Sequence, residues 1–144
     1  MVPSRVLRRW STTFLVRGYD SVTMAVAAAR DCLVARNKRE IDSLYLASTT
    51  LPFADRLNAG IVATALNLRD DIHTADISSS QRAGMSALIA GLRAVRSGEK
   101  KVLVAAADKR DAKCGSNYEM LFGDGAASVL LGDEGVVAPV VLCF

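Results

Sequence analysis

The run KVLVAAAD at residues 101–108 limits the possible folds of this chain more than any other segment. Every residue between its first lysine and its last aspartate is apolar. A run of this length without a polar face is typical of a strand buried on both sides, as in a sheet covered by helices on each face. We therefore expect a layered α/β fold rather than a sandwich of half-exposed strands.

Three segments with helical periodicity fit this interpretation. The first begins at Asp20 or Ser21, either of which can cap it, and its basic residues Arg36, Lys38 and Arg39 suit a helix end. The expected inner faces are formed by Val22, Ala25, Val26, Ala29, Cys32 and Leu33 in this helix, and by Ala59, Val62, Ala63 and Leu66 in the second. The second helix is predicted within 51–68, with Pro52 near its start. The third covers 81–98 and is stopped by Gly98; its expected inner face is Met85, Leu88, Ile89, Leu92 and Val95.

Short apolar runs between these helices predict the strands. We expect strands at 43–48, 72–78, 101–108, 126–131 and 136–142, the last two joined at 133–135 and paired antiparallel at one side. Alternating strands and helices with short links predict a mostly parallel sheet packed by helices. No repeat or linker divides residues 1–144, so we expect a single domain preceded by a poorly defined basic arm at 1–18.

Composition narrows the classes of function. The net charge is only +3, and four arginines crowd the first 17 residues. They could form a phosphate-binding or nucleic-acid-binding arm, but without interleaved aromatic residues a solvated terminus is favoured, and no nucleic-acid partner is expected. No apolar run approaches the roughly 20 residues of a membrane span. Three widely spaced cysteines and one histidine give no metal-ligand spacing, which favours reduced thiols in a cytoplasmic protein and no metal.

The segment DISSSQRAGMSALIAGL at 76–92 is the first candidate for chemistry. It runs from a strand end through small residues into a helix, an elbow that leaves unpaired N–H groups and partial positive charge at its bend. A cysteine there would become a thiolate, but Gln81 can only donate a hydrogen bond to a carbonyl or enolate oxygen. Ser78, Ser79 and Ser80 would need a base. His73 lies about 20 Å from Ser79 along the same predicted strand, so small residues of a close turn are favoured.

A second candidate is FGDGAASVLLG at 122–132. Two glycines flank Asp124 and can adopt positive φ, so the segment predicts a tight turn that enters a buried strand. A phosphate site would require a helix after the glycines, and a structural turn is therefore favoured. Cys114 lies among lysines and arginines that could lower its pKa, but the sequence offers it no base, and an unreactive thiol is favoured.

Together these segments resemble the N-terminal half of the thiolase-fold condensing enzymes over residues 20–132. The closest branch comprises 3-oxoacyl-[acyl-carrier-protein] synthase III and hydroxymethylglutaryl-CoA synthase. Four landmarks carry the resemblance in order: YDSVTMAVAAARDCL, LYLASTT, the elbow with its helix, and VLVAAAD followed by MLFGDGAASVLLG. The GDG turn is the most specific, because the family places it about 40 residues after its nucleophile, and here Asp124 follows Gln81 by 43 positions.

The resemblance implies roles for several positions. Gln81 occupies the position of the acyl-accepting cysteine. Thr49 occupies the acid/base position, which is a glutamate in the hydroxymethylglutaryl-CoA branch. At this position the segment ASTT resembles the synthase III branch instead. The expected substrate-binding positions are Ser80, Arg82, Gly123 and Asp124. The family's histidine and its asparagine or second histidine belong to a second half-fold that would follow Phe144, and its first glycine-rich strand is missing or degraded in MVPSRVLRRW.

Two functions are compatible with this pattern. The first is a homologue of acyl-CoA condensing enzymes that is non-catalytic or depends on a partner, either as a pocket-shaping subunit or as a fragment. The alternative is a glutamine-type decarboxylase of malonyl-like thioesters, completed by a partner chain. Both imply a homo- or hetero-oligomer with a thiolase-like chain. Both imply an acyl-CoA or acyl-carrier-protein substrate, with no cofactor beyond the coenzyme A thioester itself.

Overall fold

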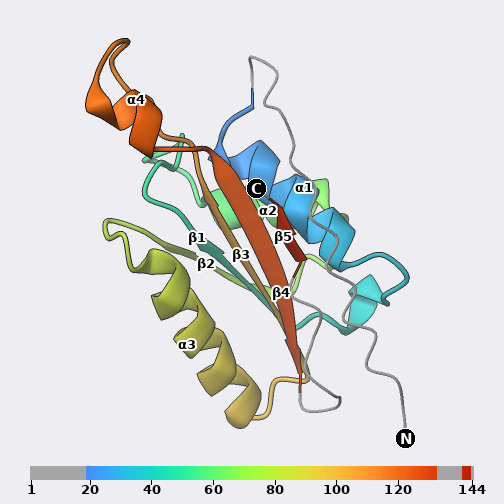
Figure 1. The fold of residues 1–144 in the computed structure, drawn as a ribbon. Coiled ribbons are helices and arrows are strands. Elements are labelled where there is room, and N and C mark those ends of the chain that lie inside the picture. The colour runs from blue at the N-terminus through green and yellow to red at the C-terminus, as the bar shows by residue number, and fades with distance from the viewer. Residues whose placement is uncertain (1–18, 133–140, 144) are drawn as a thin grey trace, which may run out of the picture.

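The computed structural model describes residues 19–132 and 141–143 (Figure 1). The basic arm and the turn expected at 133–135 lie outside these residues. The elements, in chain order, are α1 (Ser21–Cys32), the 3₁₀ helix η1 (Lys38–Glu40), β1 (Ser43–Ala47), α2 (Asn58–Ala65), β2 (His73–Ile77), α3 (Ala83–Arg96), β3 (Lys101–Asp108), α4 (Asn117–Leu121), β4 (Gly125–Gly132) and β5 (Val141–Cys143).

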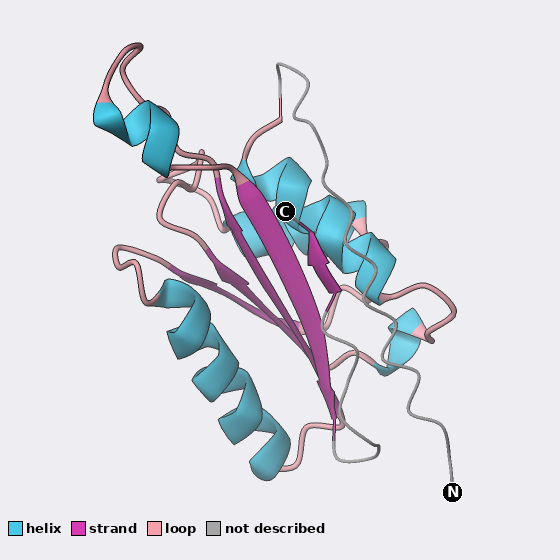
Figure 2. Cartoon of the chain, in the orientation of Figure 1, coloured by secondary structure: helices cyan, strands magenta, loops and turns pink. Residues whose placement is uncertain are grey.

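The five described strands form one sheet in the order β2-β1-β3-β4-β5. β1 pairs parallel with β2 and with β3, whereas β4 pairs antiparallel with β3 and with β5. Four strands therefore run in one direction and only β4 opposes them, which confirms the mostly parallel sheet and the antiparallel last pair. Helices cover both faces of this sheet (Figure 2), so the prediction of a layered α/β fold drawn from residues 101–108 is also confirmed.

One face of the sheet is covered by α1 and α2. Asp20 caps α1 in a capping box with Thr23, whose amide donates to Asp20 Oδ1 at 2.7 Å. Every residue expected on the inner faces of α1 and α2 is buried in one cluster with Leu44, Leu46 and Leu103 of the sheet. α1 ends earlier than its basic residues suggest, because Ala35 adopts a φ of 61° and the chain turns into η1.

α2 corrects the prediction of a helix that starts near Pro52. It begins at Asn58, and its N-cap Leu57 offers no side-chain hydrogen bond. The cap comes instead from β2: Asp76 accepts hydrogen bonds from the amides of Asn58 and Ala59, each at 2.7 Å. Because the buried Asn58 side chain also donates to the carbonyls of Phe53 and Arg56, residues 53–57 are held as a loop.

Among the described helices, α3 alone covers the other face (Figure 1), and only part of its predicted inner face is correct. Val95 packs partly buried against the core beneath the helix and Leu88 is half-buried, but Met85, Ile89 and Leu92 are 57%, 43% and 48% exposed. The buried residues of α3 are instead Ala83, Ala87 and Gly91. Gly91 explains the difference, because a Cβ atom there would lie 2.9 Å from Val104 Cγ2 and 2.8 Å from Leu131 Cδ1. The helix approaches the sheet so closely that only small side chains fit beneath it.

No helix in the described ranges is both long and apolar enough to cross a membrane.

Candidate functional site

The candidate site lies at one end of the sheet, the edge formed by the carboxyl ends of the parallel strands. Ala47, close to the end of β1, pairs with Ile77 at the end of β2 and with Ala106 near the end of β3. β4 runs the other way, so its first residue Gly125 pairs with Asp108 at the same edge. The topology therefore gathers the turn after β1, the elbow after β2, the end of β3 and the GDG turn, at the edge where α/β sheets usually bind ligands.

Asp108 connects the turn after β1 to the end of β3. Its Oδ1 accepts hydrogen bonds from the Thr49 amide at 2.6 Å, from Thr49 Oγ1 at 2.9 Å, from Ser48 Oγ at 3.1 Å and from Thr50 Oγ1 at 3.3 Å. The sequence analysis missed this residue. The available signal was its position, as the first polar residue after an otherwise apolar strand.

Thr49 reaches the predicted edge, but its hydroxyl is already engaged. It donates to Asp108, and the turn is fastened further by the Lys109 amide, which donates to Thr50 Oγ1 at 3.0 Å. A threonine hydroxyl does not ionise near neutral pH, and here it has a structural partner. In this arrangement Thr49 shapes the end of β1, and the ionisable group beside its expected acid/base position is the Asp108 carboxylate.

The GDG turn is held by its aspartate rather than by unusual glycine backbones. Asp124 Oδ1 accepts a hydrogen bond from the Arg110 amide at 2.9 Å, which closes the base of the segment 110–124. The expectation of positive φ at these glycines is wrong: among the described glycines, positive φ occurs at Gly98 and Gly115. Gly123 and Gly125 instead line a cavity.

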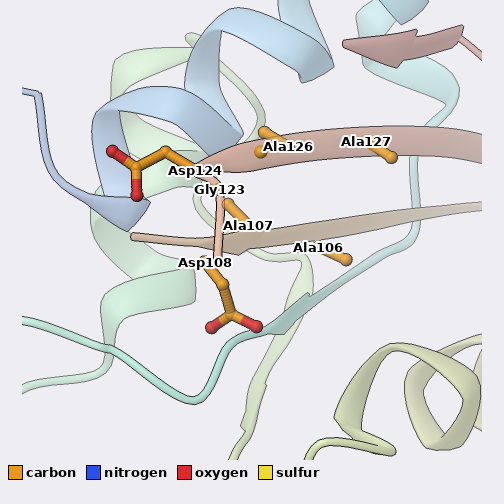
Figure 3. A pocket seen from close by; sticks show the side chains of 8 residues that line it. Ala106, Ala107, Asp108, Gly123, Asp124, Ala126 and Ala127 are labelled. Atoms are coloured by element: carbon orange, nitrogen blue, oxygen red, sulfur yellow. The ribbon is translucent and has the colours of Figure 1, made fainter. Parts of the chain in front are cut away.

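This cavity has a volume of about 540 Å³ and is bounded by the ends of β3 and β4 (Figure 3). Its walls are the alanines at 106, 107, 126 and 127, with the two glycines and the carboxylates of Asp108 and Asp124 at its ends. The two carboxylates point away from each other in Figure 3. The cavity lies beside the start of α3, because a Cβ atom on Gly84 would be 3.7 Å from Ala106 Cβ.

The elbow after β2 has the strand–turn–helix form that the sequence indicated. β2 ends at Ile77, Ser79 adopts a φ of 68°, and α3 begins at Ala83. Positive φ at a serine costs on the order of 1–2 kcal/mol, so the surrounding contacts hold this bend. Ser80 supplies them, because its Oγ accepts from the Arg82 amide at 3.1 Å and its carbonyl accepts from the Ala83 amide at 2.9 Å.

Gln81 is exposed at this bend, immediately before the first turn of α3. Its side chain makes no hydrogen bond to any described residue, so the amide can reach a ligand. His73 begins β2, at the far edge of the sheet from the elbow, and its ring packs against Tyr45 with a centroid distance of 5.7 Å. The structure therefore brings no imidazole to the serines, as the strand spacing predicted.

The segment 110–122 forms an arm between β3 and β4. It contains the short helix α4, which projects beyond the sheet in Figure 1. Tyr118 stacks on Phe122 at 5.2 Å, and the Arg110 guanidinium lies 5.2 Å from the Phe122 ring centroid. The Gly115 amide donates to Glu119 at 2.7 Å. These contacts give the arm a defined shape and leave Cys114 exposed at the surface.

The described residues contain no cluster of His, Cys, Asp and Glu able to hold a metal ion. Cys32 is buried on α1 away from this edge, and burial raises the pKa of its thiol despite opposing hydrogen bonds and the charge of Arg36. Cys32 therefore has the properties of an unreactive core residue.

Comparisons with known proteins place this fold among condensing enzymes. No family model matches the chain. It is 30% identical over 122 residues to the hydroxymethylglutaryl-CoA synthase of Pyrobaculum aerophilum, covering 83% of this chain and 35% of that enzyme. It is 32% identical over 118 residues to that of Thermococcus sibiricus, covering 80% and 34%. The chain thus spans about a third of the length of these curated relatives.

Solved structures of condensing enzymes share this fold. MvaS in complex with 3-hydroxy-3-methylglutaryl coenzyme A superposes with a TM-score of 0.76 at 23% identity, over 81% of this chain and 29% of that one. A 3-oxoacyl-(acyl-carrier-protein) synthase III superposes with a TM-score of 0.75 at 19% identity, over 88% and 40%. The resemblance stated from the sequence is confirmed: the chain has the fold of a thiolase-like condensing-enzyme half-domain.

Proposed function

We propose that this protein is a thiolase-superfamily homologue of acyl-CoA condensing enzymes that does not catalyse condensation by itself. In this proposal it acts as a non-catalytic or partner-dependent subunit. The observation that carries the proposal is Gln81, which stands at the elbow before α3 where the resemblance places an acyl-accepting cysteine.

The chemistry of the edge supports this proposal. An amide neither ionises near neutral pH nor attacks a thioester, so Gln81 cannot form an acyl-enzyme. The neighbouring serines have no imidazole beside them, and the Thr49 hydroxyl is bound to Asp108.

The proposed ligand is an acyl thioester of coenzyme A or of an acyl-carrier protein. The relatives support this class: one is a structure with 3-hydroxy-3-methylglutaryl coenzyme A, and another is an acyl-carrier-protein synthase by name. The small-walled cavity, which Gly123 and Asp124 help to line, is the proposed place for the acyl group. Ser80 and Arg82 at the elbow are the other proposed substrate-binding residues. A second thiolase-like half-domain, carried by a partner in an oligomer, would complete the site.

The alternative function is decarboxylation of a malonyl-like thioester with the help of the partner. One observation favours it: Gln81 is exposed at the start of α3, and its side-chain amide makes no hydrogen bond to a described residue. A donor at that place can stabilise the enolate oxygen that forms when carbon dioxide leaves. This step needs no covalent intermediate.

The test compares acylation and decarboxylation by the wild-type protein. The protein is incubated with radiolabelled acetyl-CoA and, separately, with malonyl-CoA labelled at its carboxylate. We expect neither protein-bound label nor released carbon dioxide. The alternative would be established if the wild-type protein released carbon dioxide and the Gln81→Ala variant did not. Ser86→Ala, a substitution to alanine on α3, is the control and should keep the release. Stoichiometric labelling of the wild-type protein would overturn both functions.

A further inference from the structure

The cavity at the ends of β3 and β4 constrains the size of the acyl group that it can hold. Its volume is about 540 Å³, and its side walls are the methyl groups of alanines. At about 30 Å³ for each non-hydrogen atom, the volume of one water molecule, an acetyl group fills only a small part of it. A chain of about eight to twelve carbons fills roughly half to two-thirds of it on the same basis. The dimensions therefore favour a medium-length chain over a short one.

The charged groups that line this cavity are both carboxylates. Asp108 and Asp124 lie at its ends, and none of its described lining residues is a lysine, an arginine or a histidine. Neither carboxylate forms an ion pair within the described part of the chain, where the ion pairs involve Arg69 and Lys101. The Arg110 amide binds Asp124, but its guanidinium lies against the Phe122 ring. The negative charge of the cavity is therefore not neutralised by a neighbouring described cation.

Both carboxylates also keep one oxygen atom that accepts no hydrogen bond from a described residue. All four hydrogen bonds to Asp108 end on its Oδ1, and the bond from the Arg110 amide ends on Asp124 Oδ1. Both residues are half-buried, so water screens their charges less than at an open surface. A third carboxylate brought into the cavity would be repelled by both and would find no described cation to pair with.

We propose that this cavity selects an uncharged acyl chain of about eight to twelve carbons and rejects an acyl chain that ends in a carboxylate. This inference rests on the proposed function, since it names the class of acyl thioester that would bind at the same site. The alanine walls supply the contact area for the chain, and Asp108 and Asp124 supply the discrimination by charge. A malonyl group is disfavoured on both grounds, because it is short and carries a carboxylate.

The test compares coenzyme A thioesters that differ only at the far end of the acyl chain. Octanoyl-CoA and suberoyl-CoA have equal numbers of acyl carbons, but the second ends in a carboxylate in place of a methyl group. Each is titrated into the full-length protein by isothermal titration calorimetry, with acetyl-CoA and free coenzyme A as references. We expect octanoyl-CoA to bind at least about tenfold more tightly than either suberoyl-CoA or acetyl-CoA, because each buried methylene group raises affinity about fourfold.

Two variants separate the size of the cavity from its charge. Ala127→Leu narrows the cavity and should weaken octanoyl-CoA binding several-fold, while Ala27→Leu, at an exposed position of α1, should bind like the wild type. Asp124→Asn keeps an acceptor for the Arg110 amide but removes one charge, so the preference for octanoyl-CoA over suberoyl-CoA should fall. Asp111→Asn removes an exposed charge outside the cavity and should retain the preference. Circular dichroism confirms that the four variants are folded.

Three results would overturn the inference. They are binding of suberoyl-CoA as tight as that of octanoyl-CoA, binding of acetyl-CoA as tight as that of octanoyl-CoA, and no binding of any thioester. The first two leave the proposed function in place, because a thioester still binds, although without selection. The third removes the acyl thioester as the ligand. Failure of the non-catalytic function is seen separately, as covalent labelling of the wild-type protein, which does not depend on the length or charge preference of the cavity.

Discussion

Replacing Asp108 by alanine removes the carboxylate that accepts four of the hydrogen bonds between the turn after β1 and the end of β3. Two donors of Thr49 lose a carboxylate partner, at 2.6 Å from the amide and 2.9 Å from the hydroxyl. The hydroxyls of Ser48 and Thr50 also lose Asp108 as an acceptor, but they make weaker contacts with it, at 3.1 Å and 3.3 Å. The bond from the Thr50 amide to Ser48 Oγ, at 3.0 Å, remains. We count the two Thr49 bonds as charge-assisted and half-buried, at about 1.5 kcal/mol each, which gives a loss of about 3 kcal/mol.

The measurement is urea unfolding followed by far-ultraviolet circular dichroism. Asp108→Asn keeps one carbonyl oxygen as acceptor but removes the charge, so we expect it to lose about 1 kcal/mol. Asp111→Ala, an exposed aspartate three positions on, serves as the control and should change stability by less than about 0.5 kcal/mol. Amide hydrogen exchange at Thr49 should accelerate in the order wild type, Asp108→Asn, Asp108→Ala.

The reasoning would be refuted if Asp108→Ala were no more destabilising than Asp111→Ala, or if Thr49 exchange were the same in all three proteins. Either result would mean that the Asp108 carboxylate does not hold the turn after β1, and that the Thr49 hydroxyl is free to act on a ligand.

Gly91→Ala should destabilise the protein by about 1–2 kcal/mol in the same unfolding assay, because its Cβ overlaps Val104 and overpacking outweighs the gain in helix propensity. Gly84→Ala, whose Cβ meets only Ala106 at 3.7 Å, should be neutral or stabilising by up to about 1 kcal/mol; a similar loss in both would contradict the close approach of α3. A cysteine introduced as Gln81→Cys should react with iodoacetamide at lower pH than one introduced as Ser86→Cys, because the first lies at the start of α3; identical pH profiles would argue against an activating elbow. In a Cys143→Ser background, Ellman's reagent should titrate Cys114 in the native protein and Cys32 only after unfolding, since burial raises the pKa of Cys32 and blocks access to it. Folding favours the protonated Cys32 thiol, so the contribution of this thiol to stability is present below the ordinary thiol pKa of 9.0 and is lost as the pH rises through the higher pKa of the folded state. Unfolding curves recorded at several pH values should lose this dependence in Cys32→Ala.

The sequence predicted those parts of the fold in which the local pattern permits one solution. The run at 101–108 has no polar face, so it must be buried on both sides, and β3 has these same bounds. The predicted inner faces of α1 and α2 are also buried, because apolar residues recur at helical spacing in both segments. The elbow was also predictable, since a strand end, small residues and a helical period occur there in uninterrupted order.

The features that the sequence analysis missed depend on contacts between distant residues. Asp76 and Asn58 are 18 positions apart, and only their hydrogen bonds reveal why α2 begins where it does. Asp108 and Thr49 are 59 positions apart, so the fastening of the β1 turn becomes visible only when parallel pairing brings the two strand ends together. Propensity and periodicity carry no information at such separations.

α3 shows how a local pattern can be correct and still be assigned to the wrong side. Its large apolar residues do form a stripe at helical spacing, but periodicity identifies a stripe without saying what covers it. The opposite side, with Ala83, Ala87 and Gly91, permits an approach so close that a methyl group would collide with Val104, and the sheet therefore takes the small residues. Met85, Ile89 and Leu92 therefore stay exposed on the outer side of the helix.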